Sequence, residues 1–199
     1  MTRNKQNAPV DACYYLTFNV IDWVSLFTRP LYKQIVVDSL NYFILVKGVK
    51  IYAWCLMTSH LHLLAGTDDT YSMANFERDF KKFTTVKLLA AIESEPDLRR
   101  EWMLRLFEEY GKSLKKIEKL SIWQNCSSPV HIDCKQNDTI LRQQIASIHE
   151  DPVKDGIVDL PESYLFSSAG DYTGTLIKGL VQVTVLRQGV TGINRLTAN

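Results

Sequence analysis

Two histidines separated by a single residue are the first feature of the sequence that could do chemistry. His60 and His62 flank Leu61 in the apolar stretch 60–65 (HLHLLA). Because side chains alternate between the two faces of a β-strand, both imidazoles are expected to project from one face of a sheet and Leu61 from the other. Two imidazoles on one face could act as two ligands of one metal ion. The alternative is that the two histidines are surface residues of a half-exposed strand and have no functional role.

The residues around this pair predict the elements that position it. Residues 13–20 (CYYLTFNV) have the aromatic and β-branched composition of a strand. Pro30 opens an apolar-periodic segment that ends at Gly48, which predicts a helix. Residues 50–57 and 60–65 predict two strands of an antiparallel hairpin, joined by a two-residue turn. The histidines therefore begin a strand directly after a short turn, where a site can be held rigidly.

The second half of the chain predicts three more helices and a late strand. The helices are expected over residues 72–93, 97–110 and 138–150, and the strand over 130–132. Their apolar stripes are Phe76, Phe80 and Phe83, then Leu98, Trp102 and Leu106, then Ile140, Leu141, Ile145 and Ile148. Pro152 is expected to stop the last helix. The order of elements predicts an α+β fold with a ferredoxin-like antiparallel sheet, helices packed on one face, and extra helices.

Composition narrows the class of protein. The 199 residues are 46% hydrophobic and 23% charged, which fits one globular domain and excludes a disordered or low-complexity protein. The net charge is only +1, so any binding to nucleic acid must come from local groups of basic residues. No apolar run is long enough to span a membrane and the N-terminus lacks a signal-peptide pattern, so we expect a cytoplasmic protein without a membrane partner.

The four cysteines show no CxxC spacing, so free or buried thiols are expected rather than disulfides. Cys126, His131 and Cys134 have the wrong spacing for a zinc site and no fourth ligand nearby.

Seven segments together resemble one protein family. They are YYLTFNV at 14–20, IYAWCLMTSHLHLLAG at 51–66, FERDFKKFTTVKL at 76–88, REWML at 100–104, IWQ at 122–124, SIHEDPVKDGIV at 147–158 and PESYLFSSAGDY at 161–172. The chain is similar over these segments to the REP-associated tyrosine transposases, within the IS200-like, single-tyrosine HUH transposases. The histidine pair alone is weakly specific, but its combination with the segments before and after it is strong.

The resemblance implies a ferredoxin-like fold, a homodimer, and a DNA transposition activity that cuts and rejoins single-stranded DNA beside a folded hairpin. It also implies that His60, His62 and a further polar residue hold Mg²⁺ or Mn²⁺. In the family, a tyrosine on the late helix attacks phosphorus and stays linked to a DNA 5′ end. A phenolate, with a pKa near 10, leaves far more readily than an alkoxide, so the stored bond can be rejoined.

The sequence departs from the family pattern at the nucleophile. Ser147 stands where the catalytic tyrosine is expected, and Asp151 stands where the third metal ligand, usually an amide, follows four residues later. On a helix these two positions lie side by side, so the placement is kept while the nucleophile is lost. Asp151 remains a suitable oxygen ligand for Mg²⁺ or Mn²⁺. His149 points to the opposite side of the helix, and we expect it at the surface.

Basic residues gather in two groups that could neutralise phosphates. The first is Lys81, Lys82 and Lys87, and the second is Lys112, Lys115, Lys116 and Lys119. An ordinary solvated helix face would show the same groups, so the resemblance is what favours DNA contact. Trp123 is a candidate for stacking on a base, although Tyr14, Tyr15 and Trp54 are expected in the core.

The resemblance places an HUH transposase-like domain at residues 1–174 and leaves 175–199 as an extension of unknown role. We expect a protein that binds single-stranded DNA with hairpins, as a transposase or a domesticated derivative, and that is impaired in cleavage by Ser147. The alternatives are an active metal-dependent strand transferase or nuclease that uses another nucleophile, and a regulatory dimer partner of an intact transposase.

Overall fold

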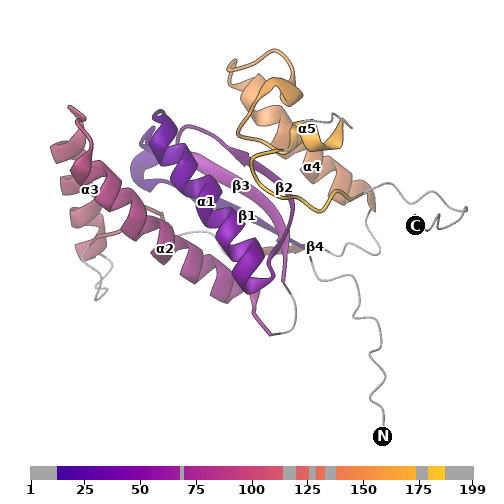
Figure 1. Ribbon diagram of the computed structural model, residues 1–199, viewed down its shortest axis with the longest axis horizontal. Helices are drawn as coiled ribbons and strands as arrows, with labels where there is room; N and C mark the ends of the chain where they lie inside the picture. Colours follow the sequence, from indigo (N-terminus) through magenta and orange to yellow (C-terminus); the bar gives the residue numbers. More distant parts are fainter. Residues whose placement is uncertain are drawn as a thin grey trace, which may run out of the picture.

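The protein is described by a computed structural model, in which the described residues are 13–67, 70–113, 120–125, 129–132, 138–173 and 179–186 (Figure 1). The predicted DNA-contact residues Lys115 and Lys116, together with Lys119, lie outside these residues. Within the described residues, no helix is long and apolar enough to cross a membrane.

A four-stranded antiparallel sheet organises the molecule, with the strands in the order β2-β3-β1-β4. The strands are β1 (Cys13–Asn19), β2 (Lys50–Leu56), β3 (His60–Gly66) and β4 (Val130–Ile132). The predicted hairpin is formed by β2 and β3, and β3 lies between β2 and β1 at the centre of the sheet. This arrangement confirms the predicted α+β fold.

Helices α1 (Pro30–Lys47) and α2 (Met73–Ser94) cover one face of the sheet (Figure 1). α1 ends at Gly48, whose φ of 68° closes the helix and is readily adopted only by glycine. α2 begins after Ser72, whose hydroxyl accepts a hydrogen bond from the amide of Asn75. The core on this face includes Leu61 and Leu63 of β3 with aromatic side chains of both helices. Leu61 therefore points away from the face that carries the histidines.

Helix α4 (Asp138–Lys154) packs on the opposite face, against β2 and β3. Its buried residues Ile145 and Ile148 share a second core with Cys55 and Leu64. The helix continues through Pro152, so the prediction that this proline stops it is wrong. Because proline has no backbone N–H group, it costs the helix one hydrogen bond. This proline lies near the C-terminus of the helix, and the chain beyond it still forms helical hydrogen bonds, such as the one from the amide of Asp155 to Asp151 O. Asp151 thus lies inside the helix.

Helix α3 (Arg100–Ser113) buries a different face from the one predicted. Met103 and Phe107 are buried, whereas Leu98 is fully exposed and Trp102 is 54% exposed. The predicted stripe of Leu98, Trp102 and Leu106 is therefore wrong at its first two positions. The helix begins three residues later than expected, which places Leu98 in the preceding turn. Three short helical turns complete the fold, η1 (Ile21–Trp23), η2 (Pro161–Ser163) and α5 (Ala169–Tyr172).

The described cysteines differ in state. Cys55 is a buried free thiol, as predicted. Cys13 is disulfide-bonded, so the prediction of free thiols is wrong for this residue. Spacing in the sequence does not reveal which cysteines the fold brings within bonding distance.

The edge of β2 that faces away from β3 is covered by two later segments of the chain. The amide of Leu56 donates to Phe166 O and the amide of Ser168 donates to Trp54 O. Further along the strand, the amide of Thr184 donates to Ile51 O. Val181, in the same late segment, is buried in the α1/α2 core. The described part of the predicted extension 175–199 therefore packs on the fold, and the boundary at residue 174 stays a prediction.

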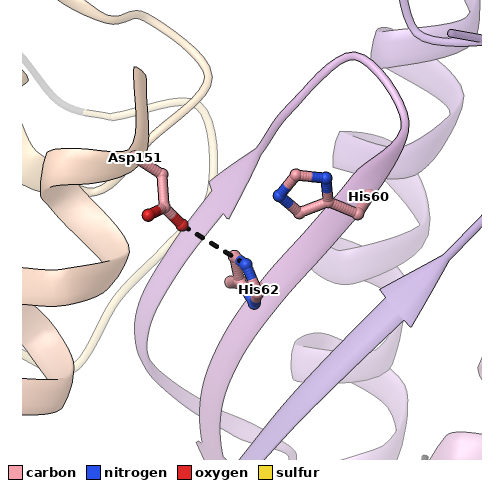
Figure 2. A group of neighbouring side chains, drawn as sticks. All are labelled: His60, His62 and Asp151. Carbon is pink, nitrogen blue, oxygen red and sulfur yellow. Dashed lines mark ion pairs between the residues drawn. The ribbon is translucent and has the colours of Figure 1, made fainter. Parts of the chain in front are cut away.

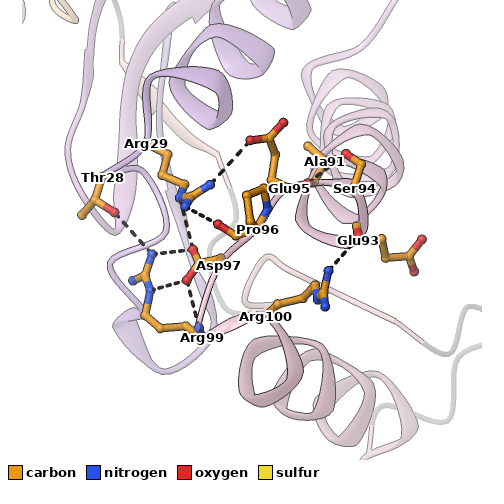
Figure 3. Close-up of polar contacts among 10 residues, drawn as sticks. All are labelled: Thr28, Arg29, Ala91, Glu93, Ser94, Glu95, Pro96, Asp97, Arg99 and Arg100. Carbon is orange, nitrogen blue, oxygen red and sulfur yellow. Dashed lines mark hydrogen bonds and ion pairs between the residues drawn. The ribbon is translucent and has the colours of Figure 1, made fainter.

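Ion pairs tie the segment that follows β1 to the corner between α2 and α3 (Figure 3). Asp97 accepts from Arg29 at 3.4 Å and from Arg99 at 3.2 Å. Arg99 also donates to Ser25 O at 3.0 Å. Because the Asp97 side chain is only 7% exposed, these contacts hold the two segments together with little competition from water.

We expect Asp97→Asn to destabilise the protein by about 1 kcal/mol at neutral pH, because the charge-assisted bonds are weakened. Hydrogen bonds from Arg99 hold the pKa of Asp97 below its ordinary value of 3.8. The stabilisation is therefore present above that value and is lost as the pH falls through the lower pKa of the folded state. Urea unfolding at pH 7 and pH 3 checks this. A variant as destabilised at pH 3 as at pH 7 would contradict it.

Candidate metal centre

Three side chains converge on the histidine face of the sheet (Figure 2). His60 and His62 come from β3 and Asp151 comes from α4. Each offers one ligand atom, and these atoms lie within 4.8 Å of one another. His62 Nε2 is 3.3 Å from Asp151 Oδ2. The structure therefore brings together the three residues predicted as metal ligands, although His62 and Asp151 are far apart in the sequence.

The strand register explains how the imidazoles are presented. Thr17 of β1 lies opposite His62, and Asn19 lies opposite His60. Since residues paired across strands share a face, both β1 side chains flank the histidines. α4 then lies across β2 and β3, so that Asp151 reaches the histidines from its last turn.

His62 is oriented by two hydroxyl groups. Its Nδ1 is 2.8 Å from Tyr15 Oη and 3.0 Å from Thr17 Oγ1, and the Tyr15 ring stacks on the imidazole at 5.6 Å between centroids. These contacts leave Nε2 to face Asp151. A hydroxyl can either donate to Nδ1 or accept from it, so both tautomers of His62 are accommodated. Sequence analysis missed the role of Tyr15 and Thr17, although their alternation on β1 in phase with the histidines was a usable signal.

The electrostatics of the centre favour neutral imidazoles. Burial, together with His60 and Lys154, lowers the pKa of His62 to about 4. Burial also lowers the pKa of His60, against the opposing effect of Asp151. Burial raises the pKa of Asp151, against the opposing effects of Lys154 and His60. At neutral pH both histidines therefore carry lone pairs that can bind a cation.

The donor set fits a divalent cation. Two imidazole nitrogens and one carboxylate oxygen form a mixed nitrogen and oxygen donor set that can hold a divalent metal ion, with water completing the shell. Ligands bonded at about 2.1 Å lie at most about 4.2 Å apart, so small side-chain rotations bring the three atoms into range. Asn19 supplies a further observation, because its Oδ1 is buried without a hydrogen-bond partner opposite His60. A water bound to the cation could donate to such an atom.

Two other residues of α4 differ in their surroundings. Ser147 is exposed and lies one helical turn before Asp151. His149 is only 7% exposed, so the prediction that it lies at the surface is wrong. Its Nε2 is 2.8 Å from Ser168 Oγ, and its ring packs edge-on to Tyr172 of α5. The prediction considered a single buried stripe on α4, whereas α5 covers a second side of this helix.

Trp123 is not available to bind DNA. It is 2% exposed, its Nε1 donates to Thr84 Oγ1 at 2.7 Å, and its ring stacks on Phe27. The prediction that it stacks on a base is therefore wrong. The short segment around it gives no sign in the sequence that residue 123 bridges to Val20 at the end of β1.

The predicted basic residues of α2 lie apart from the centre, because α2 covers the other face of the sheet. Lys81 is paired with Glu77 at 2.6 Å and donates to Gln124 O. Lys82 and Lys87 are exposed. Among the described residues, Lys154 is a basic residue that lies beside the centre, and its Nζ is 3.6 Å from Asp151 Oδ1. Sequence analysis did not single out Lys154, although its position three residues after Asp151 on a helix was a signal.

The fold is similar to that of one REP-associated tyrosine transposase of known structure. A structure of a REP-associated tyrosine transposase bound to a REP hairpin aligns with a TM-score of 0.58 and 15% identity, over 99% of this chain and 100% of that one. A protein classed provisionally as a transposase, from Deinococcus radiodurans R1, aligns with a TM-score of 0.44 and 13% identity, over 73% of this chain and 96% of that one. No family model matches the sequence, and no curated protein matches it. At this identity the likeness concerns the fold.

Proposed function

We propose that the protein binds single-stranded DNA that carries a hairpin, and that it holds one phosphodiester at the His60, His62 and Asp151 centre with weak or no cleavage. The observation that carries this proposal is the convergence of two imidazoles and a carboxylate, all partly exposed, where α4 meets the histidine face of the sheet. The fold likeness to a hairpin-bound transposase supports the DNA ligand, as does the sequence resemblance described above.

The residues of the chain would divide the work as follows. His60, His62 and Asp151 would hold a divalent cation, which supplies charge stabilisation at the phosphate when bound. Tyr15 and Thr17 keep the His62 ring in orientation.

Lys154 is the basic side chain at the centre and is 59% exposed, so it can swing toward a phosphate oxygen. The Ser147 hydroxyl is a weak nucleophile with a short reach. Among the described residues, no base is hydrogen-bonded to the Ser147 hydroxyl, which is why cleavage is expected to be impaired.

Active cleavage by another tyrosine is the second candidate function. Tyr15 is the phenol in contact with the centre, but burial raises its pKa and its hydroxyl is engaged with His62. The hydroxyls of Tyr164 and Tyr172 donate to Leu56 O and Tyr52 O, so both serve the core. A homodimer, or a regulatory pairing with an intact transposase, rests on the resemblance alone.

The test is an electrophoretic mobility shift with a DNA hairpin that has a single-stranded extension, in Mn²⁺ and in EDTA. We expect a complex with this DNA that is tighter in Mn²⁺, weakened by His60→Ala, and absent with blunt duplex DNA. We expect no covalent product under denaturing conditions. Equal affinity for duplex and hairpin DNA, or no DNA binding, would overturn the proposal.

A further inference from the structure

A strained turn lies beside the candidate centre. Asp22 and Trp23 have φ angles of 50° and 54°, and no other non-glycine residue among the described ones has a positive φ. Two consecutive residues in this left-handed region are costly, and a tryptophan there is a marked outlier. Burial of the ring does not explain the cost, because Trp23 is 56% exposed.

The turn is held from both sides. Ile21 is fully buried, and its amide donates to Ile122 O at 2.9 Å. The amide of Val20 donates to Ser59 O at 2.8 Å, next to His60. After the turn, Val24 is 7% exposed, and Ser25 O accepts from Arg99. The surrounding structure therefore holds the backbone from which the Trp23 side chain projects.

The Trp23 ring lies against the candidate metal centre. It contacts the His60 ring, with 5.5 Å between the ring centroids and 73° between the ring planes. His60 in turn packs against His62 at 4.8 Å. This contact involves one side of the indole, and more than half of the Trp23 side chain remains accessible to other partners.

We propose that Trp23 is a stacking platform for a base of single-stranded DNA next to the phosphate held at the centre. This inference rests on the proposed function and adds a binding residue to it. Aromatic faces beside a backbone-binding site are how single strands are held without sequence preference, because every base offers a flat π-face. In a duplex the bases are already stacked on each other, so Trp23 would favour unpaired DNA.

Substitution by glycine separates this role from a structural one. Trp23→Gly fits the positive φ, so we expect the melting temperature to be kept or raised. The same variant should bind the hairpin with a single-stranded extension about tenfold more weakly. The matched control is Trp102→Ala, because Trp102 is exposed to nearly the same extent, 54%, on α3. It should leave DNA affinity unchanged.

Fluorescence gives an independent readout on the intact residue. The chain has four tryptophans, of which Trp54 and Trp123 are buried. In a Trp102→Phe protein, Trp23 is thus the exposed emitter, and the extended hairpin should quench it while the blunt hairpin should not. Unchanged affinity of Trp23→Gly, or no quenching on saturation with DNA, would overturn the stacking role while the proposed function stands. Failure of the wild-type protein to bind any DNA would overturn both.

Discussion

Ser147→Tyr is expected to form a covalent tyrosine–5′-phosphate adduct with hairpin-bearing single-stranded DNA in Mn²⁺, whereas the wild-type protein forms none. Ser147 is exposed one turn before Asp151, so a tyrosine there would place its phenol beside the phosphate held at the centre. The phenolate is both a competent nucleophile and a good leaving group for rejoining. A protein–DNA band that survives denaturing electrophoresis measures the adduct. The DNA is labelled at its 3′ end, so that the label stays on the fragment whose 5′-phosphate is bonded to the tyrosine, while the upstream fragment leaves with a free 3′-hydroxyl.

The adduct should depend on the centre. His60→Ala or His62→Ala in the Ser147→Tyr protein should abolish it, because the charge that develops on the phosphate would lose its stabilisation. Asp151→Asn should increase it, since a neutral amide leaves more of the cation's charge for the phosphate.

An adduct formed by the unmodified protein would overturn the impaired-enzyme interpretation and direct attention to Tyr15. No adduct from either Ser147→Tyr or its Asp151→Asn form, despite tight binding, would mean that more than the nucleophile has been lost.

Mn²⁺ is expected to raise the melting temperature of the wild-type protein, and His62→Ala is expected to remove this rise. A cation that binds the folded state stabilises it in proportion to the logarithm of its concentration over Kd. Loss of one of the three protein ligands should weaken Mn²⁺ binding by at least about 100-fold. Tyr15→Phe leaves the ligands in place but removes a contact that orients His62, so it should weaken Mn²⁺ binding by about tenfold.

The control for the metal measurement is His131→Ala, which removes an exposed histidine on β4 that is not part of the centre. This variant should respond to Mn²⁺ as the wild-type protein does. Isothermal titration calorimetry gives the affinities directly. If His62→Ala and the wild-type protein bound Mn²⁺ equally, His62 would not be a ligand.

Local patterns in the sequence predicted the elements well where a single physical rule governs them. Pro30 and Gly48 mark the ends of α1 because one fits the first helical turn and the other a positive φ. Strand alternation placed His60 and His62 on one face, as the sheet register shows. Asp151 was predicted as a ligand from the family resemblance, since no local rule links a helix residue to a strand so far away in the chain.

The predictions were wrong where tertiary contacts decide whether a side chain is buried. Trp123 was predicted as a candidate for stacking on a base and His149 was predicted at the surface, but both are buried by contacts that the local pattern does not reveal. Leu98 was predicted in a helix over residues 97–110, whereas the helix begins at Arg100. In each case the surroundings of the side chain depend on which distant segment packs there, and periodicity along one element carries no information about that.

The covered edge of β2 limits how two copies of this chain could associate. An uncovered edge strand is a template on which another chain can extend the sheet, and proteins commonly block it. Here the backbone groups of Leu56 and Ile51 are taken by Phe166 and Thr184. At the other edge of the described sheet, β4 has three residues, which offers little length for pairing. Continuous sheets across two subunits are thus disfavoured, and the same arrangement protects the folded chain from edge-to-edge aggregation.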